Sequence, residues 1–460
     1  MRVGTKRSRP LSVATCHIAE ARAAEALGDA VVATSCYQTA LRHALRCRTT
    51  PPLSDTLTAD ARVDPCCVPA LLGCAVSLLG DAADRAAVDA VERLLRDAVD
   101  AARTPTRPLE ERALLQTAQS HLALLMAQQR REEEANAVMR QMGCLYRLAP
   151  EVLSYDLLPP AVDSDAAAVE VAAGLDDALP TSMLDHLHAC FAPDADFWKS
   201  HKYNSPDTGY FSYSHALHDA KQPTTQWEQI LMTLRTLVAK RMRPDVARAT
   251  HVEWWAHCRP HSTGHQLHYD SDAEGKLDAH GQPRHPIASC VLYLSSDDAS
   301  RVGGPTLVTT QRRGDSALCT AGWLGYPTFG RLLSFDGGVL HSVVPGRGPS
   351  PAPGKRRVTL MVAFWDGIDI VPGDKPGASR PFPARDAADT SVWVTQLSGG
   401  STLRDDWEAD AVLARQAKLV PLRPLPRVWA DADEARNTAD GVALAQLHGM
   451  PHYDTCFQGF

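Results

Sequence analysis

The sequence of 460 residues lacks any run of about 18 consecutive apolar residues, the length that a helix needs to cross a bilayer, so no transmembrane helix is expected. It also lacks a basic excess. Its net charge is −7, whereas proteins dedicated to nucleic acid are usually basic, so a nucleic-acid partner is disfavoured. Aromatic residues make up only 6%, but the 44% hydrophobic fraction excludes wholesale disorder and permits two or three folded domains.

The cysteines lack any metal or disulfide spacing. There are twelve, and Cys66–Cys67 is the only adjacent pair. This scatter excludes a zinc ribbon and a regular disulfide framework. Free thiols are typical of a reducing compartment, so we expect an intracellular protein of the cytoplasm or nucleus. The first nineteen residues hold four basic residues and no acidic one, which leaves an organelle address open beside a plain basic tail over 1–14.

Residues 15–150 are rich in Ala, Leu and Arg and predict stacked helical hairpins. Leu27-Gly28-Asp29 suits a turn, and the small residues Ala33 and Ala40 flank Tyr37, which would fill the groove between two helices. This spacing resembles one tetratricopeptide repeat unit. Later helices of the module are expected at 84–102 and, as a pair, at 110–128 and 131–147. Modules of this kind bind partners more often than they catalyse.

Residues 151–245 are expected to be a linker and helices that cover a second domain. The stretch Asp163 to Leu179 is acidic and Ala-rich, and it predicts a linker or a short helix. Residues 181–196 and 224–242 have the apolar spacing of helices.

From about Thr250 the pattern changes to short β-type runs separated by Gly, Pro and Asp. The predicted strands are Val252–Trp255, Ile287–Leu294, Thr306–Thr310, Arg331–Phe335, Val339–Val344 and Arg357–Trp365. Such strands indicate a sandwich or barrel over residues 246–372. Residues 373–460 predict a C-terminal extension with one helix near Asp405–Lys418. The fold class is therefore α+β and multidomain.

Three residues of the β region suit a metal ion. His268 and Asp270 are two residues apart, so on a strand they point to the same face. His341 is the candidate for a third ligand. Two histidines and one carboxylate leave three positions of an octahedral metal open, which suits Fe(II) that must also bind a co-substrate and O2.

An arginine on the last predicted strand suits an anion. Alternation puts Arg357 on one face with Thr359 and Ala363, which leave room for a ligand, while Val358 is on the opposite face. An arginine inside a small barrel is costly unless it meets an anion. Arg356 remains the alternative.

The order of these features resembles the 2-oxoglutarate- and Fe(II)-dependent oxygenases of the prolyl-4-hydroxylase-like type. Besides the His-x-Asp pair, the distal His341 and the arginine strand, the chain has Tyr293-Leu294 on a strand and a Gly303-Gly304 turn. The resemblance covers about residues 250–366 and implies a double-stranded β-helix, a jelly-roll or cupin-like fold. It implies that His268, Asp270 and His341 hold catalytic iron.

The same resemblance implies that Arg357 and Tyr293 bind the distal carboxylate of 2-oxoglutarate. The cofactors would be Fe(II), 2-oxoglutarate and O2, with ascorbate as reductant. Cys258 stands about where some relatives have a tyrosine, so the chain departs from the pattern there. The nucleic-acid demethylase branch has a second arginine six residues after the first. This chain has Ala363 there, which disfavours demethylation of nucleic acid.

The expected activity is hydroxylation of a C–H bond on a protein or peptide side chain recruited by the helical module. A small-metabolite hydroxylase and a catalytically inactive scaffold remain alternatives. Trp255 and Asp272 are weak candidates for substrate contacts. Core packing is favoured for at least one of Trp254 and Trp255. A solvated position in a loop is favoured for Asp272.

Overall fold

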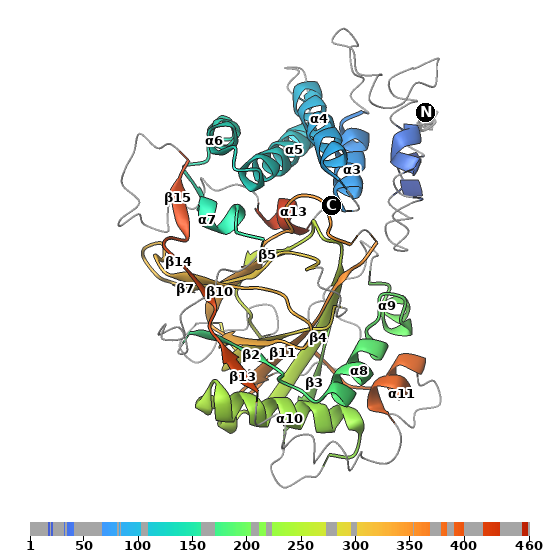
Figure 1. Cartoon of the computed structure of the whole chain (residues 1–460), viewed down its shortest axis with the longest axis vertical. Helices are drawn as coiled ribbons and strands as arrows, with labels where there is room; N and C mark the ends of the chain where they lie inside the picture. The colour runs from blue at the N-terminus through green and yellow to red at the C-terminus, as the bar shows by residue number, and fades with distance from the viewer. Residues whose placement is uncertain are drawn as a thin grey trace, which may run out of the picture.

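The computed structural model describes most of the chain. The described residues are 17–18, 20–21, 32, 35–40, 67–80, 82, 84–102, 109–157, 171–203, 211–217, 223–272, 283–295, 301–352, 354–368, 379–383, 391–399, 417–432 and 453–458. Two β-sheets lie at the centre of the molecule, and helices cover them from two sides (Figure 1).

The larger sheet has eight strands. Their order is β12 (Ser379–Pro381), β3 (Ser212–Ala216), β4 (His251–Arg259), β11 (Arg357–Trp365), β6 (Ala288–Tyr293), β9 (Leu332–Asp336), β2 (Ala172–Asp176) and β13 (Lys418–Val420). The smaller sheet has the order β14 (Arg423–Leu425), β8 (Gly322–Gly325), β7 (Thr306–Arg312), β10 (Val339–Val343) and β5 (His265–His268). A two-stranded ribbon joins β1 (Tyr146–Leu148) to β15 (Trp429–Asp431).

Along the chain, the central strands alternate between the sheets. β4, β6, β9 and β11 belong to the larger sheet, and β5, β7, β8 and β10 belong to the smaller one. This alternation is the winding of a double-sheet jelly roll. Val291 and Tyr293 of one sheet pack against Val308 and Val339 of the other, so apolar side chains fill the space between the sheets. The α+β class and all six predicted strands are confirmed.

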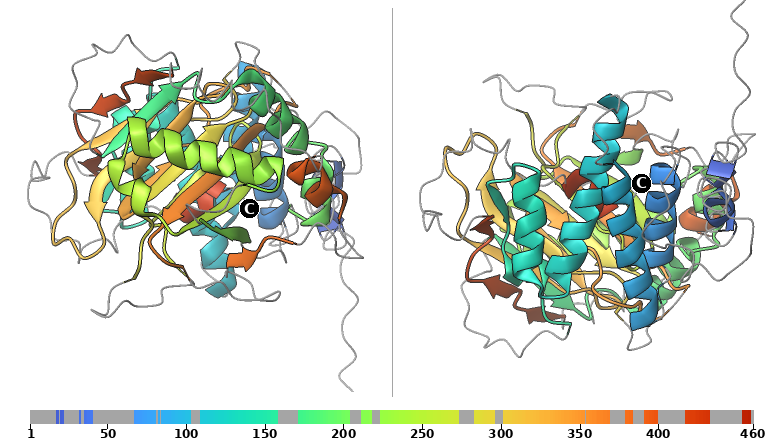
Figure 2. Two further views of the ribbon diagram at one scale, coloured as in Figure 1. Left: turned by 90° about the horizontal axis from the view of Figure 1, so that it is seen from below. Right: turned by 90° about the horizontal axis from the view of Figure 1, so that it is seen from above.

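The outer face of the larger sheet is covered by helices α8 (Thr181–Cys190), α9 (Asp196–Ser200), α10 (Gln226–Arg241) and α11 (Val392–Ser398) (Figures 1 and 2). The Thr225 side chain accepts a hydrogen bond from the Glu228 amide and thereby caps the start of α10. The fully buried Trp227 of this helix packs edge-to-face on Trp254 of β4, with ring centroids 4.8 Å apart. Trp254 therefore belongs to the core, as expected for one of the two adjacent tryptophans.

The opposite side carries helices α3 (Cys67–Gly80), α4 (Arg85–Ala102), α5 (Leu109–Gln128) and α6 (Glu132–Gln141), each packed on the next, followed by the short α7 (Pro150–Leu153) (Figure 2). Tyr37 packs on Gly73, where a Cβ atom would lie 2.4 Å from its ring. α6 ends before 147 because Gly143 takes a left-handed φ of +78°. Leu27-Gly28-Asp29 lies outside the described residues, so the resemblance to a tetratricopeptide unit stays an expectation.

This helical layer shares one hydrophobic core with the smaller sheet. Polar contacts also connect the layer to the loop between β10 and β11. The Gln128 side-chain amide donates to the carbonyl of Pro345, and Arg347 donates to the carbonyls of Gln128 and Ser154. The helices therefore help to hold the loop between the strands that carry His341 and Arg357.

Two segments differ from the sequence-based expectation. Residues 172–176, expected as part of a linker or short helix, form β2, because the small Ala173 and Gly174 fit between β9 and β13. The C-terminal extension is more than a covering segment, since β12, β13 and β14 all lie at sheet edges. Most of the helix expected near 405–418 lies outside the described residues, and Lys418 begins β13.

The C-terminal helix α13 (Tyr453–Gln458) packs against β5, the edge strand that carries His268. The amide of Gly264 donates a 2.6 Å hydrogen bond to the carbonyl of Phe457, and the Phe457 side chain is fully buried. None of the helices in the described part of the chain is long and apolar enough to cross a membrane.

We expect Phe457→Ala to lower the free energy of unfolding by about 3–5 kcal/mol, because a buried aromatic ring is lost and leaves a cavity. Leu157→Ala is the control, since Leu157 is 58% exposed and should change stability by no more than about 0.5 kcal/mol. Urea denaturation measures both. Wild-type stability of the Phe457 variant would show that α13 is not docked in solution.

Candidate metal centre

His268, Asp270 and His341 lie together between the two sheets. One ligand atom from each lies within 4.8 Å of the others. His268 ends β5 and is the register partner of His341 on β10, while Asp270 lies just beyond β5. One oxygen of Asp270 is 3.4 Å from Nε2 of His268 and 3.7 Å from Nε2 of His341. The structure thus brings the three candidate ligands to one point.

Both histidines are oriented by the backbone. Nδ1 of His268 is 2.9 Å from the carbonyl of Gln266, and Nδ1 of His341 is 3.0 Å from the carbonyl of Val339. A proton on each Nδ1 satisfies these carbonyls and leaves a lone pair on each Nε2, which is the form that binds metals. Nε2 of His341 is buried without a hydrogen-bond partner. This orphaned nitrogen and the donor set fit a divalent transition metal.

The charges of the triad favour ligation. Burial opposes ionisation of Asp270, but His341 and the hydrogen bond with His268 hold its pKa well below the usual range. Ser289 of β6 donates a 2.5 Å hydrogen bond to the other carboxylate oxygen of Asp270. Burial lowers the pKa of His341 to about 4, whereas the hydrogen bond to Asp270 raises that of His268 despite burial. An ionised carboxylate therefore faces at least one neutral imidazole.

Arg357 lies on the same inner surface. Its side chain is 3% exposed, and its Nε is buried without a hydrogen-bond partner. Its guanidinium donates a long hydrogen bond of 3.5 Å from Nη2 to Oγ1 of Thr306. No carboxylate among the described residues forms an ion pair with it. Burial lowers the pKa of Arg357, so a charged guanidinium there needs an anion.

Tyr293 lies beside this guanidinium, whose carbon is 5.4 Å from the centroid of the tyrosine ring. The Tyr293 hydroxyl is 2.8 Å from Oγ1 of Thr306 and donates to the carbonyl of Gly325. Tyr293, Thr306 and Arg357 therefore form one polar group at the end of β6 and the start of β7 and β11.

The glycine turn explains how a long side chain fits there. Gly303 has a φ of +83°, and a Cβ on it would lie 2.3 Å from Cδ of Arg357. A Cβ on Gly304 would lie 2.1 Å from the carbonyl oxygen of Val344. Both glycines are needed because the turn passes close to the guanidinium stem and to the chain after β10.

Both weak candidates for substrate contacts are buried and contact other residues of the chain. Trp255 is 6% exposed and packs with Ala363 and Trp365 in a small apolar cluster inside the barrel. Asp272 is 1% exposed and pairs with Arg284. The expectation of a solvated loop position for Asp272 was therefore wrong, because the ion pair draws the carboxylate inward.

Four polar residues at the site were not singled out in the sequence. Ser289 shares the inner face of β6 with Tyr293, and period-two alternation could have identified it. His257 and Arg259 lie on the inner face of β4, and His265 lies on β5. Only the pairing of β4 with β11 places His257 and Arg259 beside Thr359 and Arg357, so no local signal could have found them.

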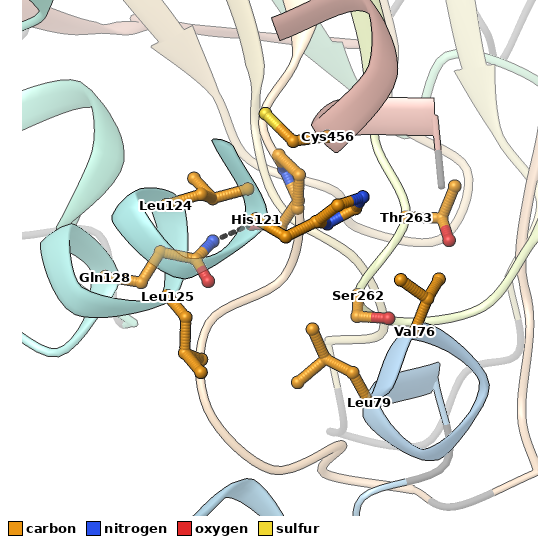
Figure 3. Close-up of a pocket in the computed structure, with 10 residues that line it drawn as sticks. Val76, Leu79, His121, Leu124, Leu125, Gln128, Ser262, Thr263 and Cys456 are labelled. Atoms are coloured by element: carbon orange, nitrogen blue, oxygen red, sulfur yellow. Dashed lines mark hydrogen bonds between the residues drawn. The ribbon is translucent and has the colours of Figure 1, made fainter. Parts of the chain in front are cut away.

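A separate pocket lies between the helical layer and the loops of the smaller sheet (Figure 3). Half of its lining residues are aliphatic; the others are His121 and Gln128 from α5, Ser262, Thr263 and Cys456 from α13. Burial lowers the pKa of His121 to about 4, so this imidazole is neutral. None of the three candidate metal ligands lines this pocket, and it is separate from the candidate centre.

A buried carboxyl on β4 gives a pH-dependent prediction. Burial raises the pKa of Glu253 to about 7, while Ser212 donates a short hydrogen bond to it. Between the ordinary pKa near 4.5 and about 7, the folded chain binds this proton and the unfolded chain releases it. The stabilising contribution is therefore complete below the ordinary pKa and is lost as the pH rises to about 7.

We expect the free energy of unfolding of the wild type to fall by up to about 3 kcal/mol relative to Glu253→Gln over that pH range. Denaturation at a series of pH values measures the difference. Parallel curves for the two proteins would mean that Glu253 titrates normally.

Comparison with known proteins gives distant structural likenesses. No family model and no curated protein matches the sequence. The structure is similar to a prolyl-4-hydroxylase from Pseudomonas putida, with 17% identity over 45% of this chain and 96% of that chain and a TM-score of 0.27. HygX from Streptomyces hygroscopicus, solved with nickel and 2-oxoglutarate bound, is similar with 11% identity over 45% and 88% and a TM-score of 0.24.

A further similar structure is an oxidoreductase of the 2OG-Fe(II) oxygenase family from Burkholderia pseudomallei, with 17% identity, a TM-score of 0.18, and coverage of 33% of this chain and 61% of that chain. At such identities and TM-scores a likeness does not assign an activity. The function is therefore argued below from the chain's own residues.

Proposed function

We propose that this chain is an Fe(II)- and 2-oxoglutarate-dependent oxygenase that hydroxylates a C–H bond and releases succinate and CO2. The observation that carries the proposal is one inner surface with two complementary parts. His268, Asp270 and His341 offer a His-Asp-His donor set, and Arg357 offers a buried guanidinium with which no acidic side chain in the described part of the chain pairs. A dicarboxylate that chelates a metal at one end would satisfy both parts.

Each residue has a role that follows from its contacts. His268, Asp270 and His341 would hold the iron, with both Nδ1 atoms fixed by backbone carbonyls. Ser289 would keep Asp270 oriented through its hydrogen bond. Arg357 would bind the distal carboxylate of 2-oxoglutarate, and the hydroxyl of Tyr293 would turn from Thr306 toward the same carboxylate.

When bound, iron supplies the oxidation of the C–H bond coupled to decarboxylation of 2-oxoglutarate by O2. The chain contributes a dry, pre-oriented enclosure. Val291 and Leu333 of the larger sheet and Val308 of the smaller one form the apolar cluster around the site. Such walls exclude water and strengthen the electrostatic contacts inside.

The substrate class that we propose is a protein or peptide side chain, with recruitment by the helical layer α3–α6. The layer lies on the smaller sheet, and α13 connects α5 to the strand that carries His268. A small metabolite is the alternative substrate, and the assay below separates the two.

The test is release of succinate by the purified protein with Fe(II), ascorbate and 2-oxoglutarate, screened against peptide pools and metabolite pools in parallel. We expect iron-dependent succinate release that one of the two sets of pools stimulates. Omission of Fe(II) is the control. A chain that binds neither Fe(II) nor 2-oxoglutarate at neutral pH would be a scaffold and not an oxygenase.

A further inference from the structure

A second arginine lies directly beside Arg357. Arg259 on β4 is the register partner of Arg357 on β11, so both side chains leave the larger sheet on the same face. Like charges that lie opposite each other on adjacent strands destabilise a sheet. Nε of Arg259 is also buried without a hydrogen-bond partner. The pair therefore creates a positive potential that nothing in the described part of the chain neutralises by an ion pair.

Arg259 has imidazole and phenol neighbours. Its Nη2 is 3.5 Å from Nδ1 of His265, and the ring of His265 lies 5.0 Å from that of His257. The Tyr203 hydroxyl is 2.8 Å from Nδ1 of His257. Burial, helped by Arg259, lowers the pKa of His257 well below the ordinary value. These groups can donate or accept hydrogen bonds, but they do not balance the guanidinium.

The two arginine side chains leave the sheet on the same face, but they have different neighbours. Arg357 is next to Tyr293 and Thr306, toward β6 and β7. Arg259 is one strand farther from β6, beside β5, and it is partly exposed. A single distal carboxylate on the co-substrate occupies one guanidinium. The second is then available to another ligand that enters between β4 and β5.

We propose that Arg259, together with His257, His265 and Tyr203, binds a carboxylate of the substrate that is to be oxidised. This inference rests on the proposed function and deepens it, because it names the chemical class of the substrate. One guanidinium with hydrogen-bonding imidazole and phenol neighbours suits a monoanion. The net charge of −7 argues against a polyanionic ligand. The carboxylate can come from a small acid or from an acidic peptide side chain.

The experiment measures binding to the full chain loaded with Mn(II) and saturating 2-oxoglutarate. One arm contains small monocarboxylates such as benzoate and N-acetylproline, and the other contains short peptides with a single Glu. Each acid is compared with its amide, so the Glu peptides are compared with Gln peptides. We expect at least one acid to bind about tenfold or more tightly than its amide, and the arm in which it occurs identifies the source.

Arg259→Gln should remove this preference and leave the 2-oxoglutarate affinity within about threefold, whereas Arg259→Lys, which keeps the charge, should retain part of it. Thermal unfolding checks that both variants fold. The proposal is overturned if acids and amides bind equally in both arms, or if Arg259→Gln weakens 2-oxoglutarate binding as much as Arg357→Gln does. Failure of the wild type to bind Mn(II) and 2-oxoglutarate would count against the proposed function instead, and the acid–amide comparison on the bare chain would still test Arg259.

Discussion

Asp270→Asn is expected to reduce Fe(II) affinity and coupled succinate release by at least about a hundredfold. Loss of residues that only orient metal ligands typically costs about 10–100-fold, and Asp270 is itself a proposed ligand. The amide keeps the size of the side chain but removes the negative charge that His268 and His341 face. The variant therefore tests the charge and not the packing. Iron titration monitored by equilibrium dialysis, together with succinate release, measures the change.

Asp177→Asn is the matched control. Its carboxylate is 74% exposed, and Asn tolerates its positive φ of 53°. Iron binding and turnover should equal the wild-type values. If Asp270→Asn retained full iron-dependent turnover, the assignment of the ligands would be wrong. Ser289→Ala should give an intermediate loss, because it removes only the hydrogen bond that orients Asp270.

Arg357→Gln should weaken 2-oxoglutarate binding by at least about thirtyfold, because removal of one member of a buried charge pair costs about 2–5 kcal/mol. Without co-substrate the same variant should be no less stable than the wild type. The wild-type guanidinium is buried and pairs with no carboxylate of the described residues, so its replacement removes a charge that they leave uncompensated. Calorimetric titration measures the affinity, and urea denaturation of the ligand-free protein measures the stability.

Arg356→Gln is the control that the chain itself offers. Arg356 precedes β11 and was the alternative candidate from the sequence, whereas Arg357 occupies the inner face beside Tyr293. Arg356→Gln should leave the affinity for 2-oxoglutarate within about threefold of the wild-type value. The opposite ranking of the two variants would transfer the co-substrate role to Arg356.

The larger part of the fold was predictable because it depends on local patterns. The six strands were recognisable from short apolar runs between turn residues, and the helices near 84–102, 110–128 and 224–242 from their apolar spacing. The spacing over 181–196 also predicted a helix, but α8 ends at Cys190. Three strands at or next to the sheet edges were not recognisable. β2, β13 and β14 are short, contain Gly, Pro or charged residues, and become strands only because a sheet edge is available to pair with them.

The helical layer shows a similar limit. Its helices were predictable, but the sequence suggested a separate module. In the structure Leu122 and Leu125 of α5 belong to the same core as Leu307 and Leu324 of the smaller sheet. Which surface an amphipathic helix covers depends on the shape of its neighbour, and spacing along the helix does not encode it.

From the sequence alone, the two-residue period of a β-strand indicated the pair His268 and Asp270 and the inward face of the arginine strand, while His341 was only the candidate for a third ligand. Only the tertiary structure decided that His341 reaches His268 and Asp270, and that Arg259 lies opposite Arg357 beside two histidines. Those placements depend on the register between strands far apart in the chain. That register is set by the burial of whole faces against α10 on one side and the smaller sheet on the other.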